Sequence, residues 1–210
     1  MIAVLDYGIG NLRSAEKALQ HVGADARLVA DPADAAGADG VVLPGVGAFG
    51  PCMEALVASG HDRVVRQAVA DEVPFLGICI GMQLLYEASE ESPGVAGLGI
   101  LPGVVRRLPA GVKHPQMQWN RLDLERGAGE CPLLAGIGPQ PWVYFVHSYA
   151  PPVNEAVVAT CDYGGPVAAV AGRGRLWSTQ FHPEKSGSVG LALLANFAGV
   201  VSGSSAPAAR

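Results

Sequence analysis

The stretch Gly77-Ile78-Cys79-Ile80-Gly81 decides how the rest of the sequence is interpreted. It follows the apolar residues 74–76 and continues into the helical pattern of residues 82–85, so a buried strand is expected to turn abruptly into a helix at Cys79. Glycines flank a nucleophile in such a turn because larger side chains would clash. The turn would place the Cys79 thiol at a helix N-terminus, where N–H groups favour the thiolate, and the N–H of Ile80 could hold an oxyanion. The stretch therefore indicates a catalytic cysteine in an α/β fold, although cysteine is also a common core residue.

The residues before this turn alternate between strand and helix patterns. Apolar strands are expected at residues 2–5, 26–29, 40–43 and 74–78, and helices at residues 12–22 and around residues 64–69. Continuously apolar strands are typical of a parallel sheet that is covered on both faces. Alternation at this spacing implies right-handed crossover connections between the strands.

The pattern changes after about Leu98, where successive strands are separated by Gly and Pro pairs. These strands are expected at residues 104–108, 142–149, 156–161, 167–171 and 175–181. They are expected to extend the same sheet with antiparallel strands, and a final helix follows at about residues 187–200. The prediction is one α/β domain over residues 1–201, with a mixed, mostly parallel central sheet flanked by helices. A flexible C-terminal tail is expected over residues 202–210.

The composition excludes several classes of protein. The chain has 210 residues, of which 50% are hydrophobic, and 14 Lys and Arg against 19 Asp and Glu give a net charge of −5. An apolar fraction of this size excludes disorder, and an acidic chain with only three lysines is not expected to bind nucleic acid. The apolar run at residues 189–201 is shorter than the roughly 20 residues that a membrane span requires.

The N-terminal residues and the cysteines favour the cytoplasm. Residues 1–5 lead directly into Asp6 without the basic segment and cleavage site of a secretory signal. No two cysteines have the CxxC spacing of a zinc ribbon, so no metal site is expected and the cysteines are interpreted as free thiols. Cys52, Cys131 and Cys161 have no local base and are expected to be packing residues.

The base that would activate Cys79 is predicted in the stretch Thr179-Gln180-Phe181-His182-Pro183-Glu184. The proline fixes the backbone, so His182 and Glu184 can be held together at the end of a strand. A carboxylate that orients an imidazole beside a thiol is the logic of a catalytic triad. His-x-Glu would also suit a metal, but no third ligand has a matching spacing. The other candidates in helical regions, His21 and His61, are expected at the surface.

Residues 77–85 together with residues 179–184 resemble the class I glutamine amidotransferases. More narrowly, the chain resembles the glutaminase subunits of imidazole glycerol phosphate synthases, which act in histidine biosynthesis. This narrower resemblance depends on four motifs: Asp6-Tyr7-Gly8-Ile9-Gly10-Asn11-Leu12, Leu43-Pro44-Gly45-Val46-Gly47-Ala48-Phe49, Trp119-Asn120 and Tyr144-Phe145-Val146-His147-Ser148-Tyr149. The matches extend from residue 2 to about residue 197.

The resemblance implies a role for each matching residue. Cys79 would be the nucleophile, His182 the general base and acid, and Glu184 the orienting carboxylate. The loop of Gly45, Val46 and Gly47 matches the family's oxyanion strand, whose backbone can flip an N–H toward the site, where Ile80 would supply a second N–H. The residues that would contact bound glutamine or line its pocket are Gln83, Glu91, His147, Ser148 and Tyr149.

The resemblance also implies a partner. The chain would form a heterodimer with a (β/α)8-barrel cyclase subunit, which receives the ammonia and makes imidazole glycerol phosphate and AICAR. The chemistry requires no metal or organic cofactor. The chain departs from the family's Pro-His-Met-Gly-Trp-Asn at Gln116 and Gln118, in a region that lies toward the synthase subunit in the family.

Three alternatives remain open from the sequence. The chain could be the glutaminase component of another synthase, of the anthranilate or aminodeoxychorismate type, although the motifs at residues 6–12 and 43–49 argue against it. The chain could also be a regulatory or binding module that keeps the elbow without its activity. Such a module would lack one residue of the catalytic triad, and none of the three is missing. A cysteine peptidase or hydrolase with the same elbow would differ in its substrate, which labelling and turnover assays distinguish.

Overall fold

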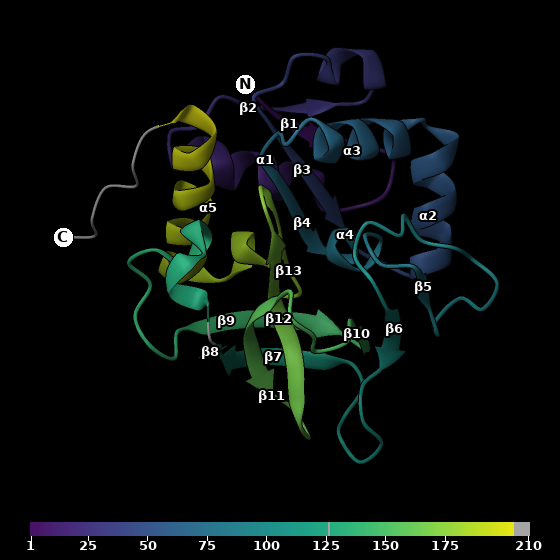
Figure 1. Ribbon diagram of the computed structural model, residues 1–210, viewed down its shortest axis with the longest axis vertical. Helices are drawn as coiled ribbons and strands as arrows, with labels where there is room; N and C mark the ends of the chain where they lie inside the picture. Colours follow the sequence, from purple (N-terminus) through teal and green to yellow (C-terminus); the bar gives the residue numbers. More distant parts are fainter. Residues whose placement is uncertain (126, 204–210) are drawn as a thin grey trace.

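A mixed eight-stranded sheet runs through the middle of the protein, in the order β2-β1-β3-β4-β13-β12-β11-β8 (Figure 1). The computed structural model describes residues 1–125 and 127–203. The parallel strands are β1 (Ile2–Leu5), β2 (Ala26–Val29), β3 (Gly40–Gly45), β4 (Phe75–Cys79) and β13 (Leu176–Thr179). The antiparallel strands are β12 (Pro166–Arg173), β11 (Val157–Asp162) and β8 (Asp123–Leu124). The predicted mixed, mostly parallel central sheet is confirmed.

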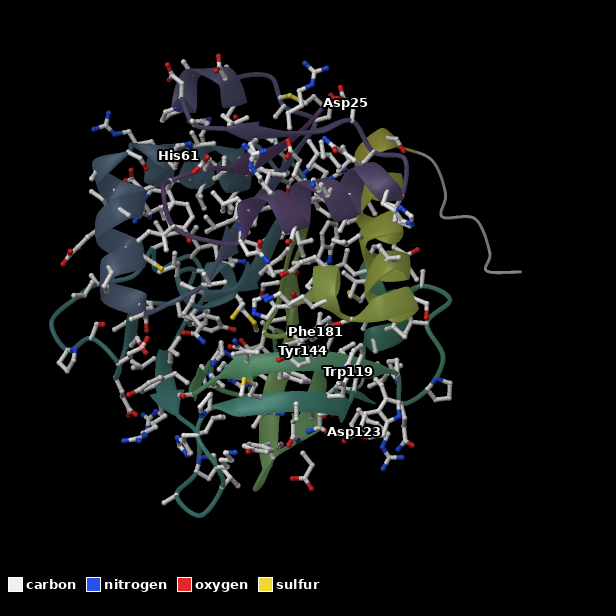
Figure 2. The ribbon with its side chains drawn as sticks, turned by 180° about the vertical axis from the view of Figure 1, so that it is seen from behind. Asp25, His61, Trp119, Asp123, Tyr144 and Phe181 are labelled. Carbon is white, nitrogen blue, oxygen red and sulfur yellow. The ribbon has the colours of Figure 1, made fainter. Side chains whose placement is uncertain are left out.

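Helices cover both faces of the parallel strands, as the continuously apolar strands require. Helix α1 (Leu12–His21) packs against α5 (Gly187–Ser202) on one face, and α2 (Phe49–Ala58) packs against α3 (His61–Ala70) on the other (Figures 1 and 2). Every residue of β1, β3 and β4 is buried between these layers. The carboxyl ends of β3, β4 and β13 therefore form a fixed edge, because their strands cannot move without disrupting the core.

Several strands of the second half do not join the central sheet, so the prediction of one extended sheet is wrong for them. Among the described residues, strand β9 (Trp142–His147) pairs only with β7 (Gln116–Arg121), in an antiparallel ribbon below the carboxyl ends of the central strands (Figure 1). A second small sheet contains β10 (Tyr149–Ala150), β6 (Val104–Arg107) and β5 (Ala88–Ser89). A sequence pattern indicates that a segment is extended, but pairing between distant strands depends on tertiary contacts.

Two helices differ from the sequence-based expectation. Helix α2 has no counterpart among the predicted elements, since Gly50-Pro51 resembles a turn. Proline is tolerated there because the first turn of a helix needs no backbone donor from it. Helix α4 (Ile80–Gln83) is one turn long and ends before Leu84, earlier than the apolar pattern predicts. The remaining helical turns are η1 (Pro32–Ala35), η2 (Ala128–Glu130), η3 (Pro132–Leu134) and η4 (Pro183–Lys185).

The C-terminal helix and one histidine also correct details of the prediction. Helix α5 includes Ser202, one residue past the expected domain end at 201, and residues 204–210 of the expected tail lie outside the described residues. His61, labelled in Figure 2, is buried rather than exposed, and its ring nitrogens lie 2.9 Å from Ser59 Oγ and 3.0 Å from the Val29 carbonyl oxygen.

Among the described residues, no helix has the length and hydropathy needed to cross a bilayer.

Candidate active site

The turn at Cys79 has the predicted elbow shape. Strand β4 ends at Cys79 and α4 begins at Ile80, and Cys79 has φ 55° and ψ −110°. A positive φ is strained for a residue with a side chain, so the surrounding structure must hold it. A Cβ atom on Gly81 would lie 1.8 Å from the Leu43 carbonyl oxygen, and one on Gly77 would lie 2.8 Å from the Gly81 carbonyl oxygen. The two flanking glycines are therefore required by backbone packing.

His182 and Glu184 lie beside this elbow because their strand is the neighbour of β4. Strand β13 runs parallel to β4, with Thr179 opposite Ile78, and His182 follows three residues later. The Nδ1 atom of His182 lies 2.9 Å from Glu184 Oε1, and both side chains are 4% exposed. Pro183 begins the short turn η4, which brings the two side chains together.

The surroundings of His182 favour its protonated form. Burial opposes the charge, but hydrogen bonds with Cys79 and Glu184 and the charges of both groups outweigh it and raise the pKa of His182 to about 10. The imidazole therefore carries a proton close to the Cys79 sulfur at neutral pH. A group in this state can donate that proton to a leaving group.

The predicted oxyanion loop lies on the other side of the elbow. Gly45, the last residue of β3, is the register partner of Cys79. The Tyr7 hydroxyl donates to the Pro44 carbonyl at 2.9 Å, and the Cys52 thiol donates to the Val46 carbonyl at 3.4 Å. Gly47 has φ +103°, a conformation that favours glycine.

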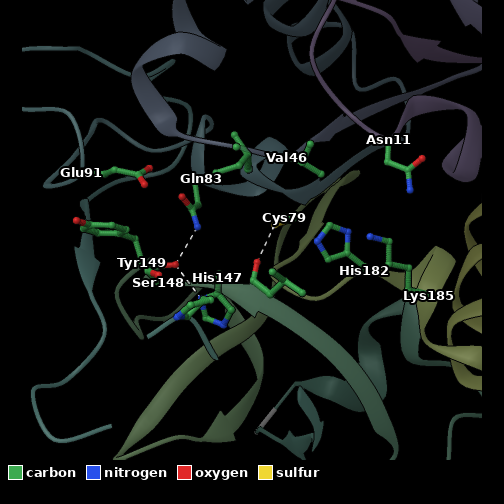
Figure 3. Close-up of a pocket in the computed structure, with 14 residues that line it drawn as sticks. Asn11, Val46, Cys79, Gln83, Glu91, His147, Ser148, Tyr149, His182 and Lys185 are labelled. Carbon is green, nitrogen blue, oxygen red and sulfur yellow. Dashed lines mark hydrogen bonds between the residues drawn. The ribbon is translucent and has the colours of Figure 1, made fainter. Parts of the chain in front are cut away.

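One cavity of about 490 Å³ joins these elements, and ten of the twelve predicted site residues line it (Figure 3). These ten are Val46, Gly47, Cys79, Ile80, Gln83, Glu91, His147, Ser148, Tyr149 and His182. Gly45 and Glu184 are the two that do not line the cavity. The lining residues without a predicted role are Asn11, Pro115, Val146 and Lys185, all within or next to motifs that the sequence had marked.

Polar groups that suit an amino acid lie at the end of the cavity away from His182 and Lys185 (Figure 3). Gln83 is 1% exposed, and its Nε2 atom donates to the Tyr149 carbonyl at 2.9 Å. Its Oε1 atom is buried and has no hydrogen-bond partner. Glu91 Oε2 accepts a 2.8 Å hydrogen bond from the backbone N–H of Phe49, which fixes the carboxylate at the start of α2. A buried acceptor and a fixed carboxylate are suited to an ammonium group.

His147 forms part of the cavity wall, supported from behind by Gln116. Burial lowers the pKa of His147 to about 4, so its ring is neutral and has one N–H, which donates either from Nδ1 to the Tyr149 carbonyl, at 2.9 Å, or from Nε2 to the Gln116 side chain. Its Nε2 atom lies 3.0 Å from Oε1 of the Gln116 side chain, which is fully buried. Of the two departures from the family motif, only Gln118 is therefore on the surface.

The other three cysteines are buried, as expected, and differ from Cys79 in their surroundings. Burial raises the pKa of Cys52 and of Cys161 to about 11, and it also raises the pKa of Cys131. These groups remain thiols at neutral pH. The cavity thus combines one cysteine at an elbow, a protonated imidazole, a glycine-containing loop and binding groups for an amine, which together suit acyl transfer from a small amide.

Comparisons with known proteins agree with this chemistry. The family model described as Glutamine amidotransferase class-I matches residues 3–200. The imidazole glycerol phosphate synthase subunit HisH of Synechococcus sp. (strain JA-3-3Ab) is 52% identical over 202 residues, which cover 93% of this chain and 92% of that protein. The same subunit of Deinococcus radiodurans is 50% identical over 200 residues, with the same coverage. A crystal structure of a glutamine amidotransferase has the same fold, with a TM-score of 0.73 at 21% identity, and the match covers 94% of this chain and 98% of that one.

Proposed function

The chain belongs to the class I glutamine amidotransferase family, as a subunit of the imidazole glycerol phosphate synthase type, and we propose that Cys79, His182 and Glu184 hydrolyse glutamine. The enzyme acts in histidine biosynthesis, as the resemblance of its sequence implied. The observation that carries the proposal is the elbow cysteine next to the 2.9 Å pair of His182 and Glu184, at the wall of a cavity with acceptors for an amino group.

The first half of the reaction forms a thioester. The Cys79 thiolate attacks the side-chain amide carbon of glutamine, so a C–S bond forms and the carbonyl oxygen becomes an oxyanion. The N–H of Ile80 and an N–H of the 45–47 loop hold this oxyanion. His182 then donates its proton to the amide nitrogen as the C–N bond breaks, and ammonia leaves.

The second half releases glutamate. A water molecule loses a proton to His182 and attacks the thioester carbon, and the C–S bond breaks to restore the thiolate. Glu184 stabilises the imidazolium in both steps through its 2.9 Å hydrogen bond to Nδ1. The α-amino group of glutamine binds at the Glu91 carboxylate and the unpartnered Oε1 atom of Gln83, which places the side-chain amide toward Cys79.

The ammonia is passed to a partner subunit, which is the (β/α)8-barrel cyclase that makes imidazole glycerol phosphate and AICAR. A patch of exposed apolar side chains on the β7–β9 ribbon supports a docking surface: Met117 is 61% exposed, Trp119 46% and Trp142 53%. The ring of Trp119 packs against Tyr144 at a centroid distance of 6.0 Å (Figure 2). Strand β9 also reaches the cavity through Val146 and His147, so docking and glutamine binding would act on the same ribbon.

The test measures glutamate release by the isolated chain, by the chain with the barrel cyclase, and by the complex with the cyclase ligand. We expect turnover to rise at each step, because hydrolysis without an acceptor wastes glutamine, and we expect Cys79→Ala to fold but not to react. A glutamine-analogue electrophile should label Cys79 in preference to Cys52, Cys131 and Cys161. Loss of activity with labelling at one of those three cysteines would exclude Cys79 as the nucleophile.

A further inference from the structure

Gln180 is a buried residue of the His182 segment to which the reaction above gives no role. Its side chain is fully buried between the nucleophile and the residue that we assign to glutamine binding. Its Nε2 atom donates to Cys79 Sγ at 3.8 Å, and its Oε1 atom accepts from Gln83 Nε2 at 3.0 Å. A single amide therefore connects Cys79 with Gln83.

The orientation of this amide follows from a backbone carbonyl. The Tyr149 carbonyl can only accept hydrogen bonds, so the atom of Gln83 that lies 2.9 Å from it must be the amide nitrogen. The same nitrogen lies 3.0 Å from Gln180, which must therefore present its oxygen there. The Gln180 nitrogen then has to face the sulfur, because the two groups of an amide lie on opposite sides.

The contacts of the Cys79 sulfur favour different protonation states. The Val146 carbonyl oxygen, at 3.8 Å, accepts a hydrogen bond from the thiol but opposes the thiolate (Figure 3). The Gln180 amide donates, so its hydrogen bond is stronger when the sulfur is negatively charged. Without that donor, formation of the thiolate would place a negative charge beside a carbonyl oxygen with one compensating hydrogen bond fewer.

We propose that Gln180 is a positioning residue for glutamine hydrolysis, which stabilises the Cys79 thiolate with its N–H and fixes Gln83 with its carbonyl oxygen. The inference rests on the function proposed above. It assigns Gln180 two separable effects: one on the state of the nucleophile, both before attack and when the thiolate leaves the thioester, and one on the binding of glutamine.

Three of the titratable groups around the sulfur keep one charge state between pH 5 and 9, and Glu91 and Lys185, which also line the cavity, are the same in every variant. Burial lowers the pKa of His147 to about 4 and raises the pKa of Cys52 to about 11. Burial also raises the pKa of Tyr7, which lies behind the oxyanion loop. The pH dependence of Cys79 alkylation in this range therefore reports on the sulfur, its partner His182 and, through His182, Glu184.

Two variants separate the effects, and a third controls for burial. Gln180→Met has a similar length but loses both hydrogen bonds, whereas Gln180→Glu keeps an acceptor for Gln83 and loses the amide donor to the sulfur. Thr179→Val is the matched control, because Thr179 is equally buried and its hydroxyl donates only to the Phe181 carbonyl, at 3.0 Å.

The experiment measures the rate of Cys79 alkylation by iodoacetamide against pH in the full chain, with the modified peptide identified by mass spectrometry. We expect the midpoint of the curve to move up by about one pH unit in Gln180→Met and not in Thr179→Val, since a hydrogen bond to a charged group has this strength. The shift should be larger in Gln180→Glu, because its carboxylate adds a negative charge beside the sulfur. In the cyclase complex, KM for glutamine should rise in Gln180→Met and stay near the wild-type value in Gln180→Glu.

Midpoints in both Gln180 variants that equal the wild-type midpoint would overturn the inference. A shift of the same size in Thr179→Val would also overturn it, because the effect would then come from general disturbance of the segment. If Gln180→Met does not fold, the midpoint of Gln180→Leu, which also loses both hydrogen bonds and adds no charge, decides in its place. Failure of the proposed function is a different result, in which wild-type Cys79 reacts no faster than the other three cysteines.

Discussion

The elbow at Cys79 and the loop at residues 45–47 end neighbouring strands at the same edge of the sheet, yet Gly81 in the elbow and Gly47 in the loop are glycines for different reasons. Gly45 resembles the elbow, because a Cβ atom there would lie 2.7 Å from the Tyr7 hydroxyl oxygen, so the adjustable part of the loop is at Val46 and Gly47. At the elbow, a Cβ atom on Gly81 would lie 1.8 Å from the Leu43 carbonyl oxygen, so packing alone requires glycine. In the loop, a Cβ atom on Gly47 would contact nothing within 4 Å, and its φ of +103° is the reason for glycine.

This difference separates the fixed part of the site from the adjustable part. The nucleophile is held by backbone atoms of two buried strands, which cannot move without disrupting the core. The loop has open space at Gly47, and a peptide plane next to a glycine can rotate at low steric cost. Control of the enzyme by a partner would therefore act on the oxyanion loop rather than on Cys79.

The largest effect is expected from Gly81→Ala. The new methyl group would overlap the Leu43 carbonyl and force β3 and β4 apart, at a cost of more than about 3 kcal/mol in the free energy of unfolding. Urea unfolding measures this loss, and the electrophile that labels Cys79 should no longer do so selectively. Stability equal to that of the wild type would show that the elbow is not fixed by packing.

Gly47→Ala is the matched variant in the loop. The new methyl group would have no other atom within 4 Å, so the loss in the free energy of unfolding is limited to backbone strain of about 1–2 kcal/mol. The protein should fold and Cys79 should be labelled at the wild-type rate, while turnover in the complex decreases. Equal destabilisation by the two substitutions would remove the distinction between the two regions.

A large effect on turnover alone is expected from Val46→Pro. Proline removes the Val46 N–H from the loop that we assign to the oxyanion, and loss of one such donor typically lowers kcat by about 10²- to 10³-fold. Binding of glutamine should be retained, because Gln83 and Glu91 are not altered. Steady-state kinetics of the cyclase complex and calorimetric titration of Cys79→Ala/Val46→Pro with glutamine measure the two quantities. A rise in KM without a fall in kcat would assign this loop to binding.

Glu184→Gln tests the fixed part of the site by removing one charge without changing the size of the side chain. The amide keeps a hydrogen bond to His182 Nδ1 but loses the charge, so we expect about a tenfold decrease in turnover. The Glu184 carboxylate contributes to the raised pKa of His182, and its removal lowers that pKa. The imidazolium is then lost at a lower pH, and the alkaline limb of the pH–rate profile should move to lower pH. A limb that moves to higher pH would contradict the role of the Glu184 charge.

The features that the sequence predicts best are those that depend on adjacent residues. The elbow at residues 77–81 and the pair of His182 and Glu184 each follow from a few adjacent residues, and the strands that carry them were predicted from apolar runs. That β13 lies next to β4 is a long-range pairing that no local pattern contains, although the spacing of His182 and Glu184 at a strand end and the family resemblance both predicted that His182 serves Cys79.

The parts of the fold and of the site that the sequence does not predict depend on contacts between residues far apart in the chain. Strand β7 has mostly exposed residues and no apolar alternation, so neither the strand nor its pairing with β9 was predicted. The contact of Gln180 with Cys79 joins residues 101 positions apart in the sequence. Helix α2 was missed because Gly50-Pro51 at its start also suits a turn.

The smallest effect is expected behind the oxyanion loop, at Cys52. Burial raises the pKa of this thiol to about 11, so it remains a donor to the Val46 carbonyl at neutral pH, at 3.4 Å. If this bond holds the loop in its resting state, Cys52→Ala should raise glutamine hydrolysis by the isolated chain about two- to fivefold, which corresponds to one weak hydrogen bond. Cys52→Ser retains a donor and is the matched control, and the cyclase complex should show a smaller difference because the partner already favours the active loop. Unchanged hydrolysis by isolated Cys52→Ala would show that the loop is held by the Tyr7 contact with Pro44 or by its own backbone, and the adjustable part of the site would then begin after Val46.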